Sequence, residues 1–206
     1  MPLIHLQQIN AATKVGVWHI TEAENFFIKH VPLQRNITHP HKRLQHLAGR
    51  FLLLELFPEF PLALIQIADT RKPFLENEAY HFSISHCGHY AAAIVSTKNR
   101  VGVDIEIPHE KIERIQHKFL SEAEKNLIGN YDNNVAMLTM AWSMKEAMFK
   151  WYGLGEVDFK KHMQLFSLSK NDKGYRALCH FAKQDKIELW LENTLIDGNN
   201  LSWVIT

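Results

Sequence analysis

The chain has 206 residues, of which 46% are hydrophobic, so it can build a packed core and is not a disordered protein. Its formal net charge of +1 gives no strongly basic surface, which argues against nucleic acid as a partner. The longest apolar runs are too short to span a bilayer, and the N-terminus lacks the basic start and apolar stretch of a signal peptide. We therefore expect a cytoplasmic protein without a membrane partner.

Strand and helix patterns alternate along the chain. The predicted strands cover residues 15–20, 63–68, 80–85, 90–96 and 101–107, and the predicted helices cover residues 21–31, 39–57, 109–118, 121–129 and 134–152. Beyond residue 160 the alternation of polar and apolar residues predicts the strands of an antiparallel sheet. A short polar turn separates strands 90–96 and 101–107, which are expected to pair as a hairpin. The pattern indicates an α+β fold.

Two of the predicted helices carry a start signal. Thr21 precedes Glu24 by three residues, and Ser121 precedes Glu124 by the same spacing. In such a capping box each side chain binds the backbone N–H of the other residue. Both helices are therefore expected to begin at these positions.

Cysteine and histidine patterns give little indication of a disulfide or a zinc site. Cys87 and Cys179 lie far apart without a C-x-x-C motif, which predicts two buried free thiols in a reducing compartment. His39, His41 and His46 could chelate zinc, but no cysteine or fourth ligand stands near them.

Two carboxylates share one face of the segment VGVDIEI. Its valines and isoleucines face one way, and Gly102, Asp104 and Glu106 face the other. Asp104 and Glu106 would lie about 7 Å apart, given the rise per residue of a strand. Like charges so placed repel each other. The face is therefore either simply solvated or holds a cation such as Mg²⁺, which prefers oxygen ligands.

A third carboxylate lies on the helix predicted over 134–152. Glu146 projects away from the apolar face, among Trp142, Phe149 and Lys150. The core-facing residues of this helix would be Met137, Met140, Ala141, Met144, Met148 and Trp151. Glu146 and Lys150 could be an ordinary exposed pair four residues apart. The neighbouring aromatic side chains instead favour a partly enclosed cleft, in which a carboxylate needs a lysine, a metal or a substrate as partner.

Basic side chains that could bind phosphates occur in the first half. Arg43 and Arg50 share one face of the predicted helix 39–57, and Gly49 leaves room for a close approach. Lys72 lies in a turn before a proline, and Ser85 and His86 lie at a strand end. The alternative is a solvated helix face and a structural histidine.

Five segments together resemble the signatures of the 4′-phosphopantetheinyl transferases. They are RKP (71–73), FSISHCG (82–88), VGVDIE (101–106), HKFLSEAE (117–124) and WSMKEAMFK (142–150), in this order. The resemblance runs from about residue 40 to residue 152. One departure is Arg71, which stands where the family has a glycine. The length resembles the surfactin-synthetase-activating type, which is a monomer of two similar halves.

The resemblance implies a fold, a reaction and its partners. It implies two similar α/β halves packed as a pseudo-dimer, each with a small, largely antiparallel sheet and packed helices, here over residues 1–98 and 99–206. It implies transfer of the 4′-phosphopantetheine arm of coenzyme A to a serine of an apo acyl or peptidyl carrier protein. Adenosine 3′,5′-bisphosphate is the second product, and Mg²⁺, or Mn²⁺, is the metal.

The resemblance also implies roles for individual residues. Metal ligands would be Asp104, Glu106 and Glu146. Catalytic residues would be Glu146, as the base, with Lys145 and Lys150. The coenzyme A contacts would be Lys42, Arg43, Arg50, Lys72, Ser85, His86, Lys145 and Lys150. Two other functions stay open, namely another Mg²⁺-dependent phosphate-ester enzyme and a catalytically inactive homologue that binds coenzyme A or carrier protein.

Overall fold

The chain divides into two compact units, each with its own hydrophobic core. The computed structural model describes residues 2–33, 36–129, 131 and 134–206. The N-terminal unit is Met1–Val101 and the C-terminal unit is Gly102–Thr206. Each combines helices with a largely antiparallel sheet, so the predicted α+β class is confirmed.

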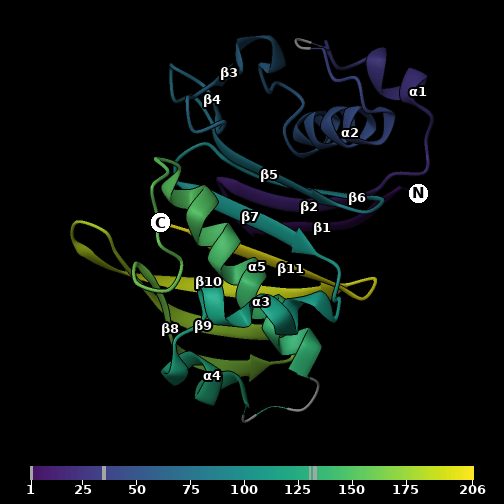
Figure 1. Ribbon diagram of the computed structural model, residues 1–206. Coiled ribbons are helices and arrows are strands. Elements are labelled where there is room, and N and C mark those ends of the chain that lie inside the picture. The colour runs from purple at the N-terminus through teal and green to yellow at the C-terminus, as the bar shows by residue number, and fades with distance from the viewer. Residues whose placement is uncertain (1, 34–35, 130, 132–133) are drawn as a thin grey trace. The chain divides into compact units, whose positions relative to one another are not determined.

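The N-terminal unit is a four-stranded antiparallel sheet with one long helix on it. Its strand order is β1-β2-β6-β5, and helix α2 packs on β2, β5 and β6 (Figure 1). Its elements are β1 (Leu3–Asn10), β2 (Thr13–His19), α1 (Glu24–Ile28), α2 (Pro40–Leu56), η1 (Leu62–Leu64), β3 (Gln66–Ile67), β4 (Pro73–Phe74), β5 (His81–Cys87) and β6 (Tyr90–Ser96).

Helix α2 begins and packs for identifiable reasons. Its N-cap is His39, whose Nδ1 accepts the Lys42 N–H, and Pro40 occupies the first helical position. Gly49 faces β5, where a Cβ would lie 2.6 Å from the Ile84 side chain. The glycine thus permits close contact between the helix and the sheet.

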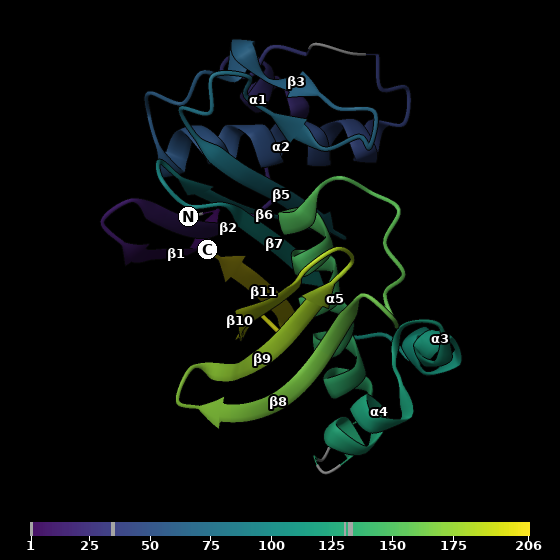
Figure 2. The ribbon, with the colours of Figure 1, turned by 90° about the vertical axis from the view of Figure 1, so that its left-hand side faces the viewer.

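The C-terminal unit is a five-stranded sheet crossed by helix α5 (Figure 2). Its strand order is β7-β11-β10-β9-β8, so the first strand of the unit lies beside the last. The elements are β7 (Val101–Glu106), α3 (Lys111–Phe119), α4 (Glu122–Gly129), α5 (Asn134–Tyr152), β8 (Met163–Asn171), β9 (Gly174–Ala182), β10 (Lys186–Ile196) and β11 (Asn199–Ile205). The six predicted core residues of α5 are all buried.

Several local predictions are confirmed and others are wrong. Ser121 and Glu124 form the expected capping box, with Glu124 Oε2 accepting the Ser121 N–H at 2.8 Å. Thr21 does not cap α1, which begins after Ala23. The predicted strand 63–68 is only partly confirmed, because Leu62–Leu64 form a 3₁₀ turn and the strand β3 covers only Gln66–Ile67. Strand β1 was not predicted. Cys87 and Cys179 form no disulfide; Cys179 is buried as predicted, whereas Cys87 is only partly buried.

The predicted hairpin between residues 90–96 and 101–107 is also wrong. Strand β6 pairs with β2 and β5, whereas β7 lies beside β11 in the second sheet. Residues 97–100 therefore join two sheets and do not close one. The boundary between the compact units falls at the start of β7.

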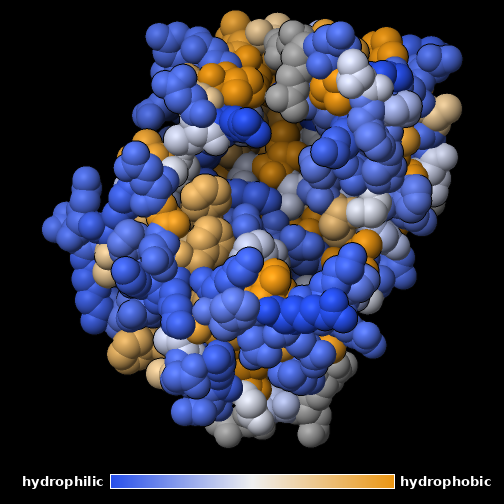
Figure 3. Space-filling view, in the orientation of Figure 1, coloured by the Kyte–Doolittle hydropathy of each residue, from blue (hydrophilic) through white to orange (hydrophobic). Residues whose placement is uncertain are grey.

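The hydropathy of the surface is as expected for a sequence without long apolar runs. The face shown in Figure 3 is mainly hydrophilic, with hydrophobic residues in small separate patches. Among the residues that the structure describes, no helix is both long and apolar enough to cross a membrane.

Candidate functional site

Strand β7 and helix α5 make very close contact at Gly102. A Cβ at this position would lie 2.1 Å from the backbone oxygen of Ala147 and 2.7 Å from the backbone nitrogen of Trp151. No side chain fits there, so the strand lies directly against the helix backbone. The face of β7 that carries Gly102, Asp104 and Glu106 is therefore turned toward α5 and is not simply solvated.

Each strand carboxylate has a partner on α5. The ammonium group of Lys150 donates to Asp104 Oδ1 at 2.6 Å, and the Asp104 side chain is only 3% exposed. The indole N–H of Trp142 donates to Glu106 Oε1 at 3.3 Å. Residues distant in sequence thus form one polar group inside the C-terminal unit.

Glu106 and Glu146 are both difficult to ionise. Burial, with repulsion from the Asp104 carboxylate, raises the pKa of Glu146 to about 7. The same two causes raise the pKa of Glu106 to about 7, against the opposing effects of Trp142 and Lys150. Asp104 and Lys150 act on both glutamates in opposite directions, so these side chains form one electrostatically coupled group.

The donor chemistry of these carboxylates fits a hard divalent cation, because all three offer oxygen ligands in a partly enclosed position. As they stand, however, no three or more His, Cys, Asp or Glu side chains among the described residues are grouped closely enough to hold a metal ion. A role for Asp104, Glu106 and Glu146 as metal ligands stays a prediction.

Lys145 lies in a different environment from the one predicted. It is completely buried, and its ammonium group is 2.6 Å from Glu124 Oε1. It also donates to the backbone oxygens of Phe119 and Phe159. Lys145 therefore forms a structural ion pair, and its predicted contact with phosphates stays a prediction.

Glu124 explains why that lysine can be buried. Its carboxylate accepts hydrogen bonds from the Ser121 N–H, the Ser121 hydroxyl and the Leu165 N–H, in addition to the Lys145 contact. A buried ion pair is tolerated when hydrogen bonds satisfy the remaining acceptors. The capping motif was visible in the sequence, but its partner on α5 was not.

Aromatic side chains enclose the Trp142 indole. The Trp142 ring stacks on Phe159 and meets Phe119 edge to face, with centroids 5.3 and 5.1 Å apart. A cavity of about 370 Å³ lies beside these rings and is also lined by Ile115 and Lys118. Phe159 follows α5 in an irregular segment, and no sequence pattern had indicated it.

The predicted basic residues of helix α2 are only partly available. Arg43 binds Glu24 through Nε at 2.8 Å and donates to the Ile37 carbonyl. Arg50 is 8% exposed, and its guanidinium lies 3.0 Å from His46 Nδ1. Lys42 is exposed. The helix therefore offers one exposed cation and two that already have protein partners.

Arg100 is a second cation near Lys72, and the sequence patterns did not predict it. Burial, with repulsion from Arg100, lowers the pKa of Lys72 to about 8. Arg100 is therefore near enough to Lys72 to influence its protonation. Ser85 and His86 are adjacent on β5 and so face opposite ways, with Ser85 buried and His86 exposed.

Comparison with known proteins gives a consistent family. Residues 100–204 match the 4′-phosphopantetheinyl transferase superfamily. Enterobactin synthase component D of Escherichia coli and of Shigella flexneri is 32% identical over 113 residues, which are 53% of this chain and 54% of the relative. A Haemophilus influenzae protein named as a candidate 4′-phosphopantetheinyl transferase is 28% identical over 63% of this chain and 60% of its own length.

The chain thus spans little more than half the length of the curated relatives that it matches. Among solved structures, holo-(acyl-carrier-protein) synthase of Thermotoga maritima aligns with a TM-score of 0.40 at 20% identity. That alignment covers 51% of this chain and 61% of the other.

Proposed function

The chain belongs to the 4′-phosphopantetheinyl transferase superfamily, and from this premise we propose that it transfers the 4′-phosphopantetheine arm of coenzyme A to a serine of an apo carrier protein. The serine oxygen would attack the β-phosphorus of coenzyme A. The bond from that phosphorus to the oxygen of the 5′-phosphate would break, and adenosine 3′,5′-bisphosphate would leave.

One observation supports this proposal above the others. Gly102 holds β7 against α5, so that Asp104, Glu106, Glu146 and Lys150 converge within the matched part of the chain. Carboxylates with raised pKa values and an adjacent lysine are typical of sites for general acid–base and phosphate chemistry.

Glu146 is our candidate for the base. Without a metal ion its pKa of about 7 lies in the range of general bases that act at neutral pH. We propose that it receives the proton of the carrier serine, directly or through a water molecule. Lys150, whose side chain is 26% exposed, would exchange its contact with Asp104 for the phosphates as they bind.

Asp104, Glu106 and Glu146 would also hold a Mg²⁺ or Mn²⁺ ion. When bound, such an ion supplies positive charge that offsets the charge on the pyrophosphate. Trp142, through its hydrogen bond to Glu106, would keep that carboxylate oriented.

The phosphates of coenzyme A would also contact basic residues of the N-terminal unit. The proposed contacts are Lys42, Arg43, Arg50, Lys72, Ser85 and His86, to which we add Arg100 because of its effect on Lys72. We further propose that the partner of the chain is an apo acyl or peptidyl carrier protein, which provides the serine. The protein would be a cytoplasmic monomer.

Intact mass spectrometry tests the function. An apo acyl carrier protein and an apo peptidyl carrier protein are each incubated with this protein, coenzyme A and Mg²⁺. We expect the mass of one phosphopantetheine to be added, and we expect EDTA and Asp104→Ala to abolish the addition. Binding of coenzyme A without transfer to either carrier would favour the inactive homologue, and release of phosphate would favour a phosphatase.

A further inference from the structure

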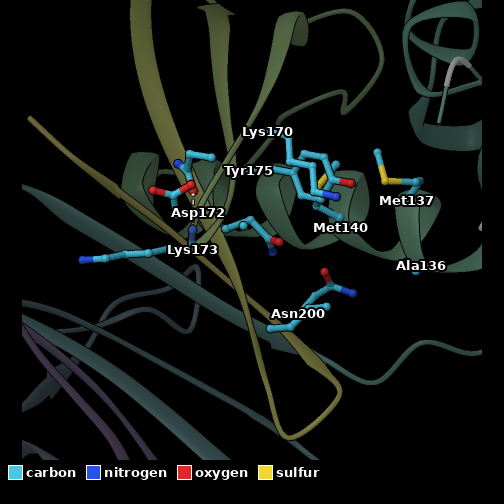
Figure 4. Close-up of a pocket in the computed structure, with 12 residues that line it drawn as sticks. Ala136, Met137, Met140, Lys170, Asp172, Lys173, Tyr175 and Asn200 are labelled. Carbon is cyan, nitrogen blue, oxygen red and sulfur yellow. Dashed lines mark hydrogen bonds between the residues drawn. The ribbon is translucent and has the colours of Figure 1, made fainter. Parts of the chain in front are cut away.

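A second cavity of the C-terminal unit lies at the hairpin between β8 and β9 (Figure 4). It has a volume of about 380 Å³, within the range of small-molecule sites, and its walls come from α5, β8, β9, β10 and β11. Its lining includes none of the carboxylates or lysines discussed above. Nothing in the proposed transfer reaction uses it.

The hairpin wall of this cavity has a fixed position. A Cβ at Gly174 would lie 2.1 Å from the backbone oxygen of Asn193, so β9 lies as close to β10 as backbone atoms permit. Thr194 Oγ1 donates to the Lys173 carbonyl at 2.6 Å, and Asn171 Oδ1 accepts the Lys173 N–H. The turn is therefore held on both sides.

Asn200 supplies the observation that indicates a ligand. It lines the cavity from β11, opposite Leu195 in the strand register, and is 2% exposed. Its side-chain nitrogen is buried and has no hydrogen-bond partner among the described residues. A buried donor without an acceptor costs about 1–3 kcal/mol. The neighbouring Asn193 differs, because its nitrogen donates to Leu201 and Ser202.

The other walls define the chemistry of the ligand. Met137 and Met140 are buried residues of α5 that form an apolar, polarisable surface. In Figure 4, Lys170 and Tyr175 lie with Met140 on one side, and Asn200 lies on the other. The Lys173 side chain extends away from the cavity, near Asp172. Lys170 is thus the cation available to a bound molecule.

We propose that this cavity binds a small carboxylate with a short apolar chain. A ligand oxygen accepts the hydrogen bond of Asn200, the ammonium group of Lys170 favours a negative charge, and the chain packs on Met137 and Met140. The buried amide then acquires the acceptor that the protein does not provide.

Methionine-methyl NMR tests the proposal site by site. The chain has six methionines, so ¹³C-methyl labelling separates Met137 and Met140 from Met163, which does not line the cavity. Pentanoate is titrated into the full chain, and pentanamide is titrated as the uncharged probe with the same carbonyl. We expect saturable shifts of Met137 and Met140 but not of Met163, with tighter binding of pentanoate.

Two variants and a matched control assign the contacts. Asn200→Leu should weaken both probes by about tenfold, the effect of about one hydrogen bond. Lys170→Gln, an exposed change that cannot disturb the core, should remove the preference for pentanoate and leave pentanamide unaffected. Lys186→Gln, an exposed lysine of β10 outside the cavity, should change neither.

The proposal is overturned if neither probe shifts Met137 or Met140 saturably, which would mean that the cavity holds water only. It is also overturned if folded Asn200→Leu and Lys170→Gln bind both probes like the unchanged chain. The carrier-transfer assay is a separate measurement, so either proposal can fail without the other.

Discussion

Lys145 and Glu146 are neighbours in the chain with opposite surroundings. Successive residues of a helix point about 100° apart, so Lys145 enters the interior while Glu146 faces the acidic strand. Lys145 is fully paired with Glu124, and Glu146 is held near Asp104 with its pKa raised. A proton is therefore easily exchanged at Glu146, whereas Lys145 fixes the helix that carries it.

Replacement of the proposed base should separate binding from turnover. Glu146→Gln keeps the size of the side chain but cannot accept a proton, so kcat should fall by at least about 100-fold. The affinity for coenzyme A, measured by calorimetry, should change little. Glu122→Gln, an exposed residue of α4, is the matched control and should retain activity. Unchanged kcat in Glu146→Gln would remove Glu146 from the role of base.

The buried Lys145–Glu124 pair predicts that a second substitution restores stability lost through the first. Lys145→Met leaves Glu124 buried and charged, which should lower the free energy of unfolding by about 3–5 kcal/mol. Replacing both residues with methionine should recover most of that stability, because no uncompensated charge remains. Denaturant unfolding of the four members of this cycle measures the effect.

A role of Lys145 in phosphate binding makes the opposite prediction. Lys145→Met would then raise KM for coenzyme A at unchanged stability, and a second change at Glu124 would not help. The exposed pair Lys125–Glu122 on α4 provides the control, and Lys125→Met should cost less than about 1 kcal/mol.

At the scale of elements, the contact between β7 and α5 decides whether the site forms. Gly102→Ala places a methyl group 2.1 Å from the Ala147 carbonyl, so the strand or the helix must move. We expect a loss of roughly 3 kcal/mol in unfolding free energy, with weaker metal-dependent activity. Gly129→Ala, where a Cβ meets nothing within 4 Å, should leave stability equal or higher. Equal changes in unfolding free energy for Gly102→Ala and Gly129→Ala would contradict the importance of the close contact at Gly102.

The turn before Lys72 carries backbone strain. Arg71 adopts a φ of 67°, in the left-handed region that favours the glycine found there in the family. Arg71→Gly should therefore raise the free energy of unfolding by about 1 kcal/mol. Arg71→Ala, which removes the charge but keeps the strained conformation, should not. If only the charge of Arg71 affects the KM for coenzyme A, Arg71→Gly and Arg71→Ala will raise this KM equally.

The elements that were predictable from sequence have local causes. The 3.6-residue period of the methionines predicted α5, and the Ser121–Glu124 spacing predicted the start of α4. Strand pairing was predicted less well, because β7 lies beside a strand almost a hundred residues away and not beside its neighbour β6. The partners of Lys145 and Trp142 depend on the same distant packing, so no local pattern could identify them.

For the molecule as a whole, the raised pKa values predict how stability depends on pH. Glu106 and Glu146 have pKa values of about 7 in the folded chain, against an ordinary 4.5. Between these values the folded state binds more protons than the unfolded state, so stability falls as the pH rises. Their contribution is fully present below about pH 4.5 and is lost as the pH passes 7. Scanning calorimetry without metal should show this trend, reduced in the Glu106→Gln, Glu146→Gln double variant.

A metal held by the same carboxylates should reverse the trend. Mg²⁺ binds the ionised forms, so it should raise the melting temperature more at pH 8 than at pH 5.5. An equal rise at both pH values would argue against these three carboxylates as the ligands.

The strand order of the C-terminal unit has a consequence during synthesis. The acidic strand β7 is made well before its neighbour in the sheet, β11, Asn199–Ile205. A nascent chain on the ribosome can complete the N-terminal sheet early, since β1, β2, β5 and β6 precede β7. The carboxylate strand must then wait, without this neighbour, until β11 has left the exit tunnel. Ribosomes stalled before residue 199 should therefore carry a protease-resistant first unit and a protease-sensitive second one.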